Sequence, residues 1–401
     1  MHVIVLGGGV VGVTTAYYLA ENGCTVTVVD RASDVALGTS FANGGQLSYS
    51  FTDALAKPGF IATLPALLSG RDPGSRVKLS PALLSWGMRF LAQCTSRRAA
   101  TNTLDVLSLA MRSEQLLDEL RDKTSFDFSY RPAGKLVLLA DNEQLAVARR
   151  GTELKQAHGC DVELLTREQA IAHEPALAHL QRPFVGAVFS ASDEVADAKL
   201  FCRGLRDYLA ASGRVTFAFD QNIENLTIDN RQVSGISGDN DMQGDAVVVC
   251  LGAWSAELLR PAGLNPHIYP VRGYSVTLPL GENPPSVSVS SLADKIVFSR
   301  LNGNMRIAGF ADFADFNAAD DTSRTDTLLT IAKQVAPQAA DYTVENTHRW
   351  GGFRPMTPDG QPLVGATRIK NLYLNTGHGM LGWTLACASA FDVTQAILKA
   401  H

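Results

Sequence analysis

The first 31 residues of the chain constrain its fold more than any other stretch. They read MHVIVLGGGVVGVTTAYYLAENGCTVTVVDR, with Gly7, Gly9 and Gly12 in G-x-G-x-x-G spacing directly after an apolar run. Short apolar runs predict strands at residues 3–6 and 25–29. Between them, a stretch rich in small residues predicts a helix at residues 10–22. This order predicts a strand–helix–strand unit with parallel strands, the building block of doubly wound α/β folds.

Each glycine of the turn has its own physical reason. Gly7 allows the tight turn, Gly9 lets the backbone approach a pyrophosphate, and Gly12 lets the helix pack closely on the strand. The helix N-terminus then offers free N–H groups and a partial positive charge to phosphates. Asp30, at the end of the second strand, is placed to accept hydrogen bonds from ribose hydroxyls. The unit therefore predicts a dinucleotide site, but by itself it does not separate NAD(P) from FAD.

Composition narrows the class of protein. A chain of 401 residues that is 46% hydrophobic can form two or three domain-sized units with real cores. The net charge is −5 and no block of Lys or Arg occurs, which argues against nucleic acid as a partner. The first predicted strand begins at residue 2, which predicts no signal peptide, and no apolar run approaches about 18 residues. We therefore expect a soluble, cytoplasmic α/β protein.

The cysteines predict neither a metal site nor a disulfide framework. They are scattered without C-x-x-C spacing, and most lie in apolar or helical stretches, where reduced core thiols are expected. The six are Cys24, Cys94, Cys160, Cys202, Cys250 and Cys387.

Beyond residue 31 the chain does not continue as a simple βαβ series. A polar, glycine-rich segment spans 39–48, and proline breakers predict loop and short helix over 53–98. Further helices are predicted at 101–122, 141–158, 197–212 and 383–399. Further strands are predicted at 135–140, 185–190, 246–250, 274–278, 295–298, 305–308 and 371–375, with a three-stranded meander at 215–219, 223–228 and 232–236.

These elements suggest two domains that share a discontinuous chain. The N-terminal unit, the meander, the buried strand that follows it and the C-terminal strand–turn–helix would form one domain from 1–50, 195–265 and 345–401. The intervening segments, 51–194 and 266–344, would form a second, sheet-rich domain over the first. The predicted fold class is thus α/β (α+β), with no internal repeat.

Five stretches together resemble one known family. They are GGGVVGVTTAYYLAENG (7–23), TSFANGGQLS (39–48), PVRGYSVTL (270–278), WGGFRPMTPDGQPLVGAT (350–367) and NLYLNTGHGMLGWTLACASA (371–390). Over essentially its whole length the sequence is similar to the FAD-dependent D-amino-acid oxidase/glycine oxidase superfamily, and within it to the bacterial D-amino acid dehydrogenases (small subunit). The resemblance implies FAD rather than NAD(P), a glutathione-reductase-like FAD-binding domain with a substrate domain, and oxidation of an amine carbon beside a carboxylate.

The resemblance also implies that FAD is held at both ends. The first glycine turn would take the pyrophosphate, residues 39–48 would run beside the flavin ring, and the turn at 377–382 would direct helix N–H groups at the pyrimidine end. For each of the last two segments, an ordinary polar loop is the alternative. The expected cofactor-binding residues are Val3, Leu6, Gly7, Gly8, Gly9, Val10, Val11, Gly12, Asp30, Arg31, Ser40, Asn43, Gly44, Gly45, Gln46, Gly252, Gly377, Gly379, Met380, Leu381 and Gly382.

FAD is expected to be non-covalent. Some sarcosine-oxidising relatives attach their flavin through a cysteine just upstream of the TPD segment. Here that neighbourhood, 348–356, reads HRWGGFRPM and contains no cysteine.

Three residues are expected to act on the substrate. In similar oxidases the arginine of the GFRPMTPDG motif makes a two-pronged contact with the substrate carboxylate, so Arg354 is assigned that role; a structural salt bridge is the alternative. Tyr274 resembles a strand position that lines the pocket, where its phenol assists, although core packing explains it equally well. His378 is a candidate acid–base, but the chemistry of the family does not require one.

The predicted reaction is FAD-dependent oxidative deamination of D-amino acids such as D-alanine to a 2-oxo acid and ammonia. The lone pair of a neutral amine would expel the α-hydrogen as hydride to flavin N5, so positioning and electrostatics do most of the catalysis. Electrons would pass to a quinone or another carrier. Glycine, sarcosine and D-proline or hydroxyproline as substrates, oxygen as the acceptor, and a flavin subunit of a larger electron-transfer complex stay open as alternatives, as does the oligomeric state.

Two apolar segments poor in charge are unlike ordinary surface loops. They are GFIATLPALLSG (59–70) and SPALLSWGMRF (80–90). We expect this region to cover the active site, and we also consider that it docks on the inner face of the cell membrane, where quinone is found. Simple burial as a lid is the alternative.

Overall fold

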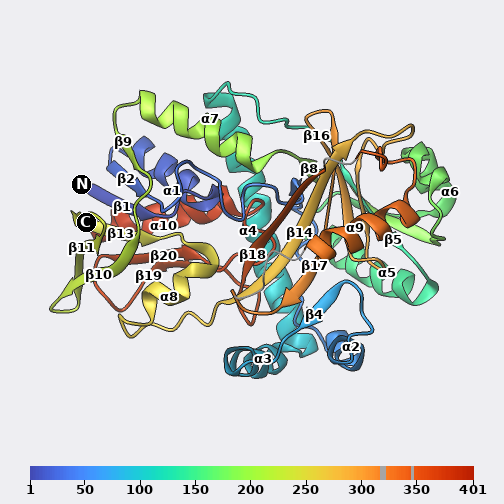
Figure 1. Ribbon diagram of the computed structural model, residues 1–401, viewed down its shortest axis with the longest axis horizontal. Helices are drawn as coiled ribbons and strands as arrows, with labels where there is room; N and C mark the ends of the chain where they lie inside the picture. Colours follow the sequence, from blue (N-terminus) through green and yellow to red (C-terminus); the bar gives the residue numbers. More distant parts are fainter. Residues whose placement is uncertain (317–321, 345–346) are drawn as a thin grey trace.

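The computed structural model describes residues 1–316, 322–344 and 347–401, and two large β-sheets lie side by side in it (Figure 1). Over these described residues the first sheet has six strands in the order β19-β20-β13-β1-β2-β9. They are β1 (His2–Leu6), β2 (Thr25–Val29), β9 (Val215–Ala218), β13 (Ala246–Val249), β19 (Leu363–Ala366) and β20 (Leu372–Thr376). The pairings are parallel from β20 to β9, and β19 runs antiparallel to β20 at the edge.

The N-terminal strand–helix–strand unit is confirmed. β1 and β2 pair in parallel, and α1 (Val10–Glu21) connects them. Gly23 follows the helix with φ +84°, a left-handed conformation that glycine adopts without strain. Side chains alternate along β1: Val3 and Val5 pack under the helices on one face, while the side chains between them pack on the other. Both faces of the sheet are therefore covered, as a parallel sheet requires.

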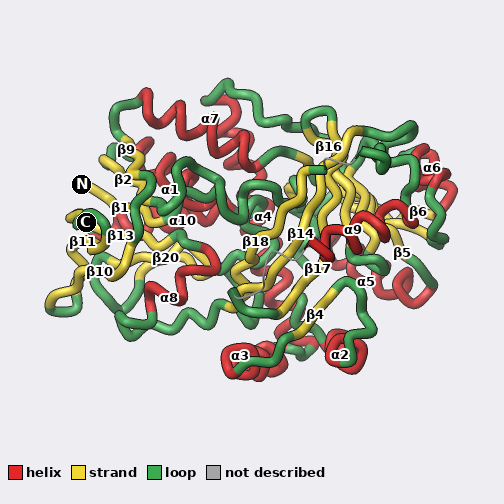
Figure 2. Tube along the Cα trace, viewed as in Figure 1, coloured by secondary structure: helices red, strands yellow, loops and turns green. Residues whose placement is uncertain are grey.

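The second sheet has nine strands among the described residues and contains the long central strands seen in Figure 2. Its order is β18-β14-β17-β16-β15-β5-β7-β6, and β4 pairs with the free end of β17. The strands are β4 (Ser75–Val77), β5 (Lys135–Leu139), β6 (Val162–Thr166), β7 (Gly186–Ser190), β14 (Tyr269–Pro279), β15 (Ser288–Ser291), β16 (Ile296–Leu301), β17 (Asn304–Phe313) and β18 (His348–Met356).

The predicted meander is wrong in one strand. β9 pairs in parallel with β2 and so extends the first sheet. The small antiparallel sheet consists instead of β10 (Ile223–Asp229), β11 (Gln232–Gly238) and β12 (Met242–Gln243). The sequence shows the short turn at Asn230 and Arg231 that makes the hairpin, but a strand's distant partner leaves no local signal. A further two-stranded sheet joins β3 (Gln46–Leu47) to β8 (Glu194–Val195).

The helices divide between the two sheets. Those of the first sheet are α1, α4 (Ser96–Lys123), α7 (Ala198–Ala211), α8 (Ser255–Leu259) and α10 (Ala386–Ala400). Those of the second sheet are α5 (Asn142–Ala157), α6 (Arg167–His173) and α9 (Thr322–Val335). Short 3-10 turns lie at Pro175–His179 and Gly252–Trp254.

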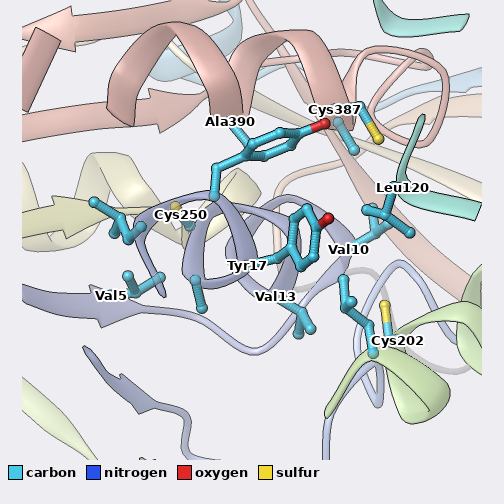
Figure 3. Close-up of a cluster of buried hydrophobic side chains, with 14 of the residues drawn as sticks. Val5, Val10, Val13, Tyr17, Leu120, Cys202, Cys250, Cys387 and Ala390 are labelled. Carbon is cyan, nitrogen blue, oxygen red and sulfur yellow. The ribbon is translucent and has the colours of Figure 1, made fainter. Parts of the chain in front are cut away.

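The core of the first sheet lies where α1 meets its neighbouring helices (Figure 3). Tyr17 projects from α1 into this cluster, and its ring stacks edge-on against Tyr18 at 5.1 Å. Cys202, Cys250 and Cys387 are buried in the same cluster, in agreement with the prediction of core thiols.

Two elements cross the predicted domain boundaries. α4, expected within 51–194, packs on α10 and contributes side chains to the core of the first sheet. β18, expected within 345–401, is an edge strand of the second sheet. The boundaries as such stay a prediction, and residues 317–321 and 345–346 lie outside the described chain.

The segment predicted as loop and short helix over 53–98 forms two helices, α2 (Pro58–Leu68) and α3 (Pro81–Gln93), which project together from one side of the molecule (Figure 1). Pro58 and Pro81 stand in the first turn, where a missing N–H costs nothing, so they begin helices instead of breaking them. No helix in the described part of the chain is both long and apolar enough to cross a membrane.

Candidate active site

A cavity of about 1120 Å³ lies between the two sheets and extends from the first glycine turn to α2. Its wall gathers residues that are distant in the sequence, because the carboxyl end of β1, residues 39–48, the second sheet and the turn before α10 all face it. The expected site residues in the wall are Gly7, Gly9, Val10, Val11, Asp30, Arg31, Ser40, Asn43, Gly44, Gly45, Gln46, Gly252, Tyr274, Arg354, His378, Gly379, Met380, Leu381 and Gly382.

Five of the expected site residues do not line the cavity that the described residues form, but lie behind its wall. Val3 and Leu6 are fully buried within β1, so their side chains support the turn and face the core. Gly8, Gly12 and Gly377 shape the backbone of the two turns. The sequence pattern that marks a turn does not separate the residues that face a ligand from those that hold the turn in place.

The glycines of the first turn are required for two different reasons. A Cβ on Gly7, whose φ is +109°, would lie 2.7 Å from the carbonyl oxygen of Cys250, and a Cβ on Gly12 would lie 1.8 Å from that of Gly7. Both positions are closed by the protein itself. A Cβ on Gly9 would meet only Ser40 Oγ, at 3.5 Å, and otherwise would point into the cavity. Gly9 is therefore the glycine that leaves room for a ligand.

Asp30 and Ser40 hold the turn as well as facing the cavity. One Asp30 oxygen accepts a hydrogen bond from Gly8 N–H at 2.6 Å, and the other accepts from Ala32 N–H at 2.9 Å. Ser40 Oγ accepts from Val10 N–H at 3.0 Å, at the first turn of α1. A carboxylate oxygen can accept a second hydrogen bond, so Asp30 keeps capacity for a ribose hydroxyl.

Residues 39–48 are attached to the second sheet and so bridge the two sheets over the cavity. Thr39 Oγ1 donates to the carbonyl of Phe353 at 2.8 Å, and Gln46 Nε2 donates to Ser288 Oγ at 2.5 Å. This segment is thus an ordered wall of the cavity. The polar composition that made it resemble a surface loop supplies these cross-links.

The turn before α10 places His378 at the cavity with a fixed, neutral ring. Gly377 and Gly379 have φ of +80° and +55°, and the imidazole Nε2 lies 3.0 Å from Ser389 Oγ. Burial lowers the pKa of His378 to about 4. α10 itself begins at Ala386, later than the expected helix start, because an irregular turn intervenes.

Arg354 lies on β18 and directs a partly buried guanidinium at the cavity. Its Nη1 donates to the carbonyl of Phe310 at 2.6 Å, and no carboxylate lies within ion-pair distance of it among the described residues. The guanidinium rests on the backbone of Gly273, where a Cβ would come within 2.4 Å of Nη2. Burial lowers the pKa of Arg354 to about 10, and Asp312 opposes that effect. A cation held in this way is well suited to bind an anionic group of a ligand.

Tyr274 also faces the cavity, but its hydroxyl is engaged. It donates to Asp312 Oδ2 at 2.9 Å, and Arg324 binds both oxygens of the same carboxylate at 2.8 and 2.6 Å. Burial and the neighbouring Asp312 raise the pKa of Tyr274 to about 12. The phenol therefore positions the wall of the cavity, and proton exchange at this hydroxyl would require breaking a buried network.

Two further residues of the wall were missed from the sequence. Lys135, at the start of the otherwise apolar β5, is buried; its Nζ donates to Ser48 Oγ at 2.9 Å and lies 4.6 Å from the centre of the Phe51 ring. Burial lowers the pKa of Lys135 to about 8. Trp254 lies under the guanidinium of Arg31 at 4.2 Å. Of these two residues, only Lys135 has a signal in the sequence, because it is a charged residue at the start of an apolar strand.

Comparison with known proteins agrees with this geometry. The sequence pattern of the family described as FAD dependent oxidoreductase (DAO) matches residues 2–396. The chain belongs to this DAO family. D-amino acid dehydrogenase 2 of Ralstonia nicotianae is 40% identical over 97% of this chain and 95% of its own length. A D-amino acid dehydrogenase of Vibrio cholerae is 40% identical over 97% of this chain and 93% of its own.

Solved structures show the same DAO fold. Glycine oxidase from Bacillus cereus superposes with a TM-score of 0.74 at 21% identity, covering 100% of this chain and 95% of that one. Glycine oxidase from Geobacillus kaustophilus gives 0.77 at 21% identity, covering 99% and 94%. The expected fold class and the recognition of the family are therefore confirmed, and this chain is an FAD-dependent oxidoreductase.

The residues of the cavity fit FAD. The N-terminus of α1 faces the cavity behind Gly9, the one glycine of its turn with open space in front, and an acidic side chain ends β2 as an adenosine ribose requires. Residues 39–48 and the turn at 377–382 form the remaining wall. On bound FAD, Gly9 and Val10 would face the pyrophosphate and Asp30 the ribose.

The buried imidazole of His378 has a consequence for stability in acid. Its pKa is about 4 in the folded chain and near 6.5 when unfolded, so between these values the unfolded chain binds more protons. The free energy of unfolding attributable to this group is then complete above about pH 6.5 and lost as pH falls toward 4. Compared with His378→Gln, which does not titrate, the native protein should lose about 2 kcal/mol more between pH 7 and pH 5.

Urea unfolding of both proteins at the two pH values measures this difference. The comparison is needed because burial raises the pKa of Glu114 and Asp193, which acts in the opposite direction. Equal losses in the two proteins would mean that His378 is charged or exposed in solution.

Proposed function

We propose that this oxidoreductase deaminates D-amino acids to 2-oxo acids and ammonia. The observation that carries the proposal is Arg354: a partly buried guanidinium at the cavity with a carbonyl partner and no carboxylate partner among the described residues. The relatives at 40% identity that are named D-amino acid dehydrogenases support the same substrate class. When bound, FAD supplies the acceptor for the two electrons and the α-hydrogen, and the imino acid product hydrolyses in water.

The chain's own residues would bind and orient the substrate. Arg354 keeps its outer N–H groups for the substrate carboxylate, because Phe310 occupies one N–H and Gly273 lets the guanidinium lie flat against β14. Tyr274 donates its hydroxyl hydrogen to Asp312, and the low pKa of His378 makes it a weak base, so we assign proton removal to neither group. Both stay candidate substrate-site residues in a positioning role. Rate enhancement would then come from orientation and from the desolvated cation.

The electron acceptor we propose is a quinone in an anionic membrane, in keeping with the predicted cytoplasmic location. An exposed apolar surface, the α2–α3 patch, covers α2 and α3 and consists of Ile61, Leu68, Leu79, Leu84, Met88 and Leu91. Residues 57–98 carry seven Lys or Arg and a single Asp, whereas the chain as a whole has a net charge of −5. Apolar side chains among basic ones suit the interface of an anionic bilayer.

Anaerobic bleaching tests the substrate class. The purified chain is mixed with D-alanine, a panel of D- and L-amino acids, glycine and sarcosine, and flavin absorbance is followed without an acceptor. We expect rapid bleaching by D-amino acids and at least about 100-fold slower bleaching by L-enantiomers, which is a difference of about 3 kcal/mol. Preference for glycine or sarcosine, or no bleaching without a partner protein, would overturn the proposal.

A further inference from the structure

α2 separates the cavity from the α2–α3 patch by the thickness of one helix. Phe60, Thr63 and Leu67 on one face line the cavity, while Ile61 and Leu68 on the other are 48% and 61% exposed. None of the residues of α2 is fully buried, and Figure 1 shows the helix projecting beside α3. One face of α2 therefore lines the cavity, and another face is exposed at the surface of the protein.

Part of the cavity wall on the side of α2 is aromatic, and the ion pair of Asp72 and Lys295 also lines the cavity. Phe60 packs edge-on against Phe90 at 4.8 Å, and Phe313, which lies on β17, also lines the cavity on this side. Phe313 lies 6.2 Å from Trp86, so an aromatic wall continues from α3 to the cavity. A helix with few buried contacts above such a wall can move aside at a low cost in free energy.

We propose that an apolar quinone reaches the cavity beneath α2, between Leu67 and Phe313. This rests on the proposed function, because the quinone takes two electrons from the reduced cofactor together with two protons and leaves as the quinol. A membrane quinone partitions into the apolar interior of the bilayer, which the α2–α3 patch would face. A zwitterionic amino acid comes from water and gains nothing from an apolar passage.

Two adjacent leucines of α2 test the passage. Leu67→Glu places a charge on the cavity side, and Leu68→Glu places the same charge on the outer side. Three quantities are measured for each: binding of a short-chain quinone to the FAD-free protein by equilibrium dialysis, cosedimentation with phosphatidylglycerol vesicles, and the rates of cofactor reduction by D-alanine and of reoxidation by the quinone and by ferricyanide.

For Leu67→Glu we expect quinone affinity and reoxidation by quinone to fall about tenfold or more, with a much smaller effect on reoxidation by ferricyanide. For Leu68→Glu we expect vesicle binding to fall about tenfold or more, with the soluble quinone bound as before. Thr63→Glu, on the same face as Leu67, tests the passage again should Leu67→Glu not retain FAD.

Four other results would each contradict the proposal. If Leu67→Glu slows reduction by D-alanine as much as reoxidation by quinone, the passage serves the amino acid and the proposal fails. Equal quinone affinity in the two variants also overturns it. If Leu68→Glu instead converts a dimer into a monomer, the patch binds a second copy of the chain. Failure of D-alanine to reduce the wild-type protein would reject the proposed function independently of the passage.

Discussion

Replacing Arg354 by alanine should lower kcat/KM for a D-amino acid by about 10²–10⁴-fold, which corresponds to the roughly 3–5 kcal/mol cost of an unpaired desolvated charge. The guanidinium is partly buried on the cavity wall and anchored by the carbonyl of Phe310, so its position is set before substrate binds. The alanine variant leaves the carboxylate of the substrate without a partner. Steady-state kinetics with D-alanine or the preferred substrate measure the effect.

Arg354→Lys is the matched variant, since it keeps the charge and loses the fork. Its kcat/KM should lie between those of wild type and alanine, because misplacement of the carboxylate costs rate as well as binding. The visible spectrum of the bound flavin should hardly change in either variant, and a carboxylate-free amine should be almost indifferent. Near-normal turnover in Arg354→Ala, or loss of its FAD, would show that the residue is structural.

Gly9→Val should purify as a folded protein that does not retain FAD. The new Cβ meets only Ser40 Oγ, at 3.5 Å, so the chain tolerates it, but the branched side chain fills space that the pyrophosphate needs. Absorbance at the flavin band relative to 280 nm measures retention, and circular dichroism measures folding. Gly151→Val, in α5 and with no atom within 4 Å of the added Cβ, is the control and should keep its FAD.

Gly12, three residues after Gly9, distinguishes this explanation from general damage. Gly12→Ala would place a Cβ 1.8 Å from the carbonyl oxygen of Gly7, so it should destabilise the turn itself. A Gly9→Val protein with a full complement of FAD would mean that the cofactor's pyrophosphate binds elsewhere, and the assignment of the first turn would have to be abandoned.

The sequence best predicts those elements whose structure depends on residues close together in the chain. The β1–α1–β2 unit followed from about 30 contiguous residues because its turn, helix and strand signals are all short-range. The position of Arg354 came from resemblance, while its anchor on Phe310, 44 residues away on a neighbouring part of the sheet, has no signal in the sequence. In the same way, the hydroxyl of Tyr274 looked free until β14 and β17 were paired, which brings Asp312 beside it.

The failures have physical causes. Counting Pro58 and Pro81 as helix breakers is wrong, because a proline in the first turn of a helix is favourable. Strand β9 was assigned to a meander because consecutive strands usually pair, yet its hydrogen bonds go to β2, which lies almost 190 residues earlier in the chain. The sequence predicts that Asp30 accepts from ribose hydroxyls, whereas its hydrogen bond from Gly8 N–H depends on how the turn folds.

The strand order of the first sheet bears on when this protein can acquire its cofactor in the cell. β13 lies between β1 and β20, and α10 covers α1, so the ends of the chain complete one structural unit. A ribosome delivers β1 first and β20 only after about 370 further residues, so the sheet cannot close during most of synthesis. Until then the first glycine turn lacks β13 and α10, which pack beside β1 and α1. We therefore expect FAD to bind late, after α10 has been translated and the sheet is complete.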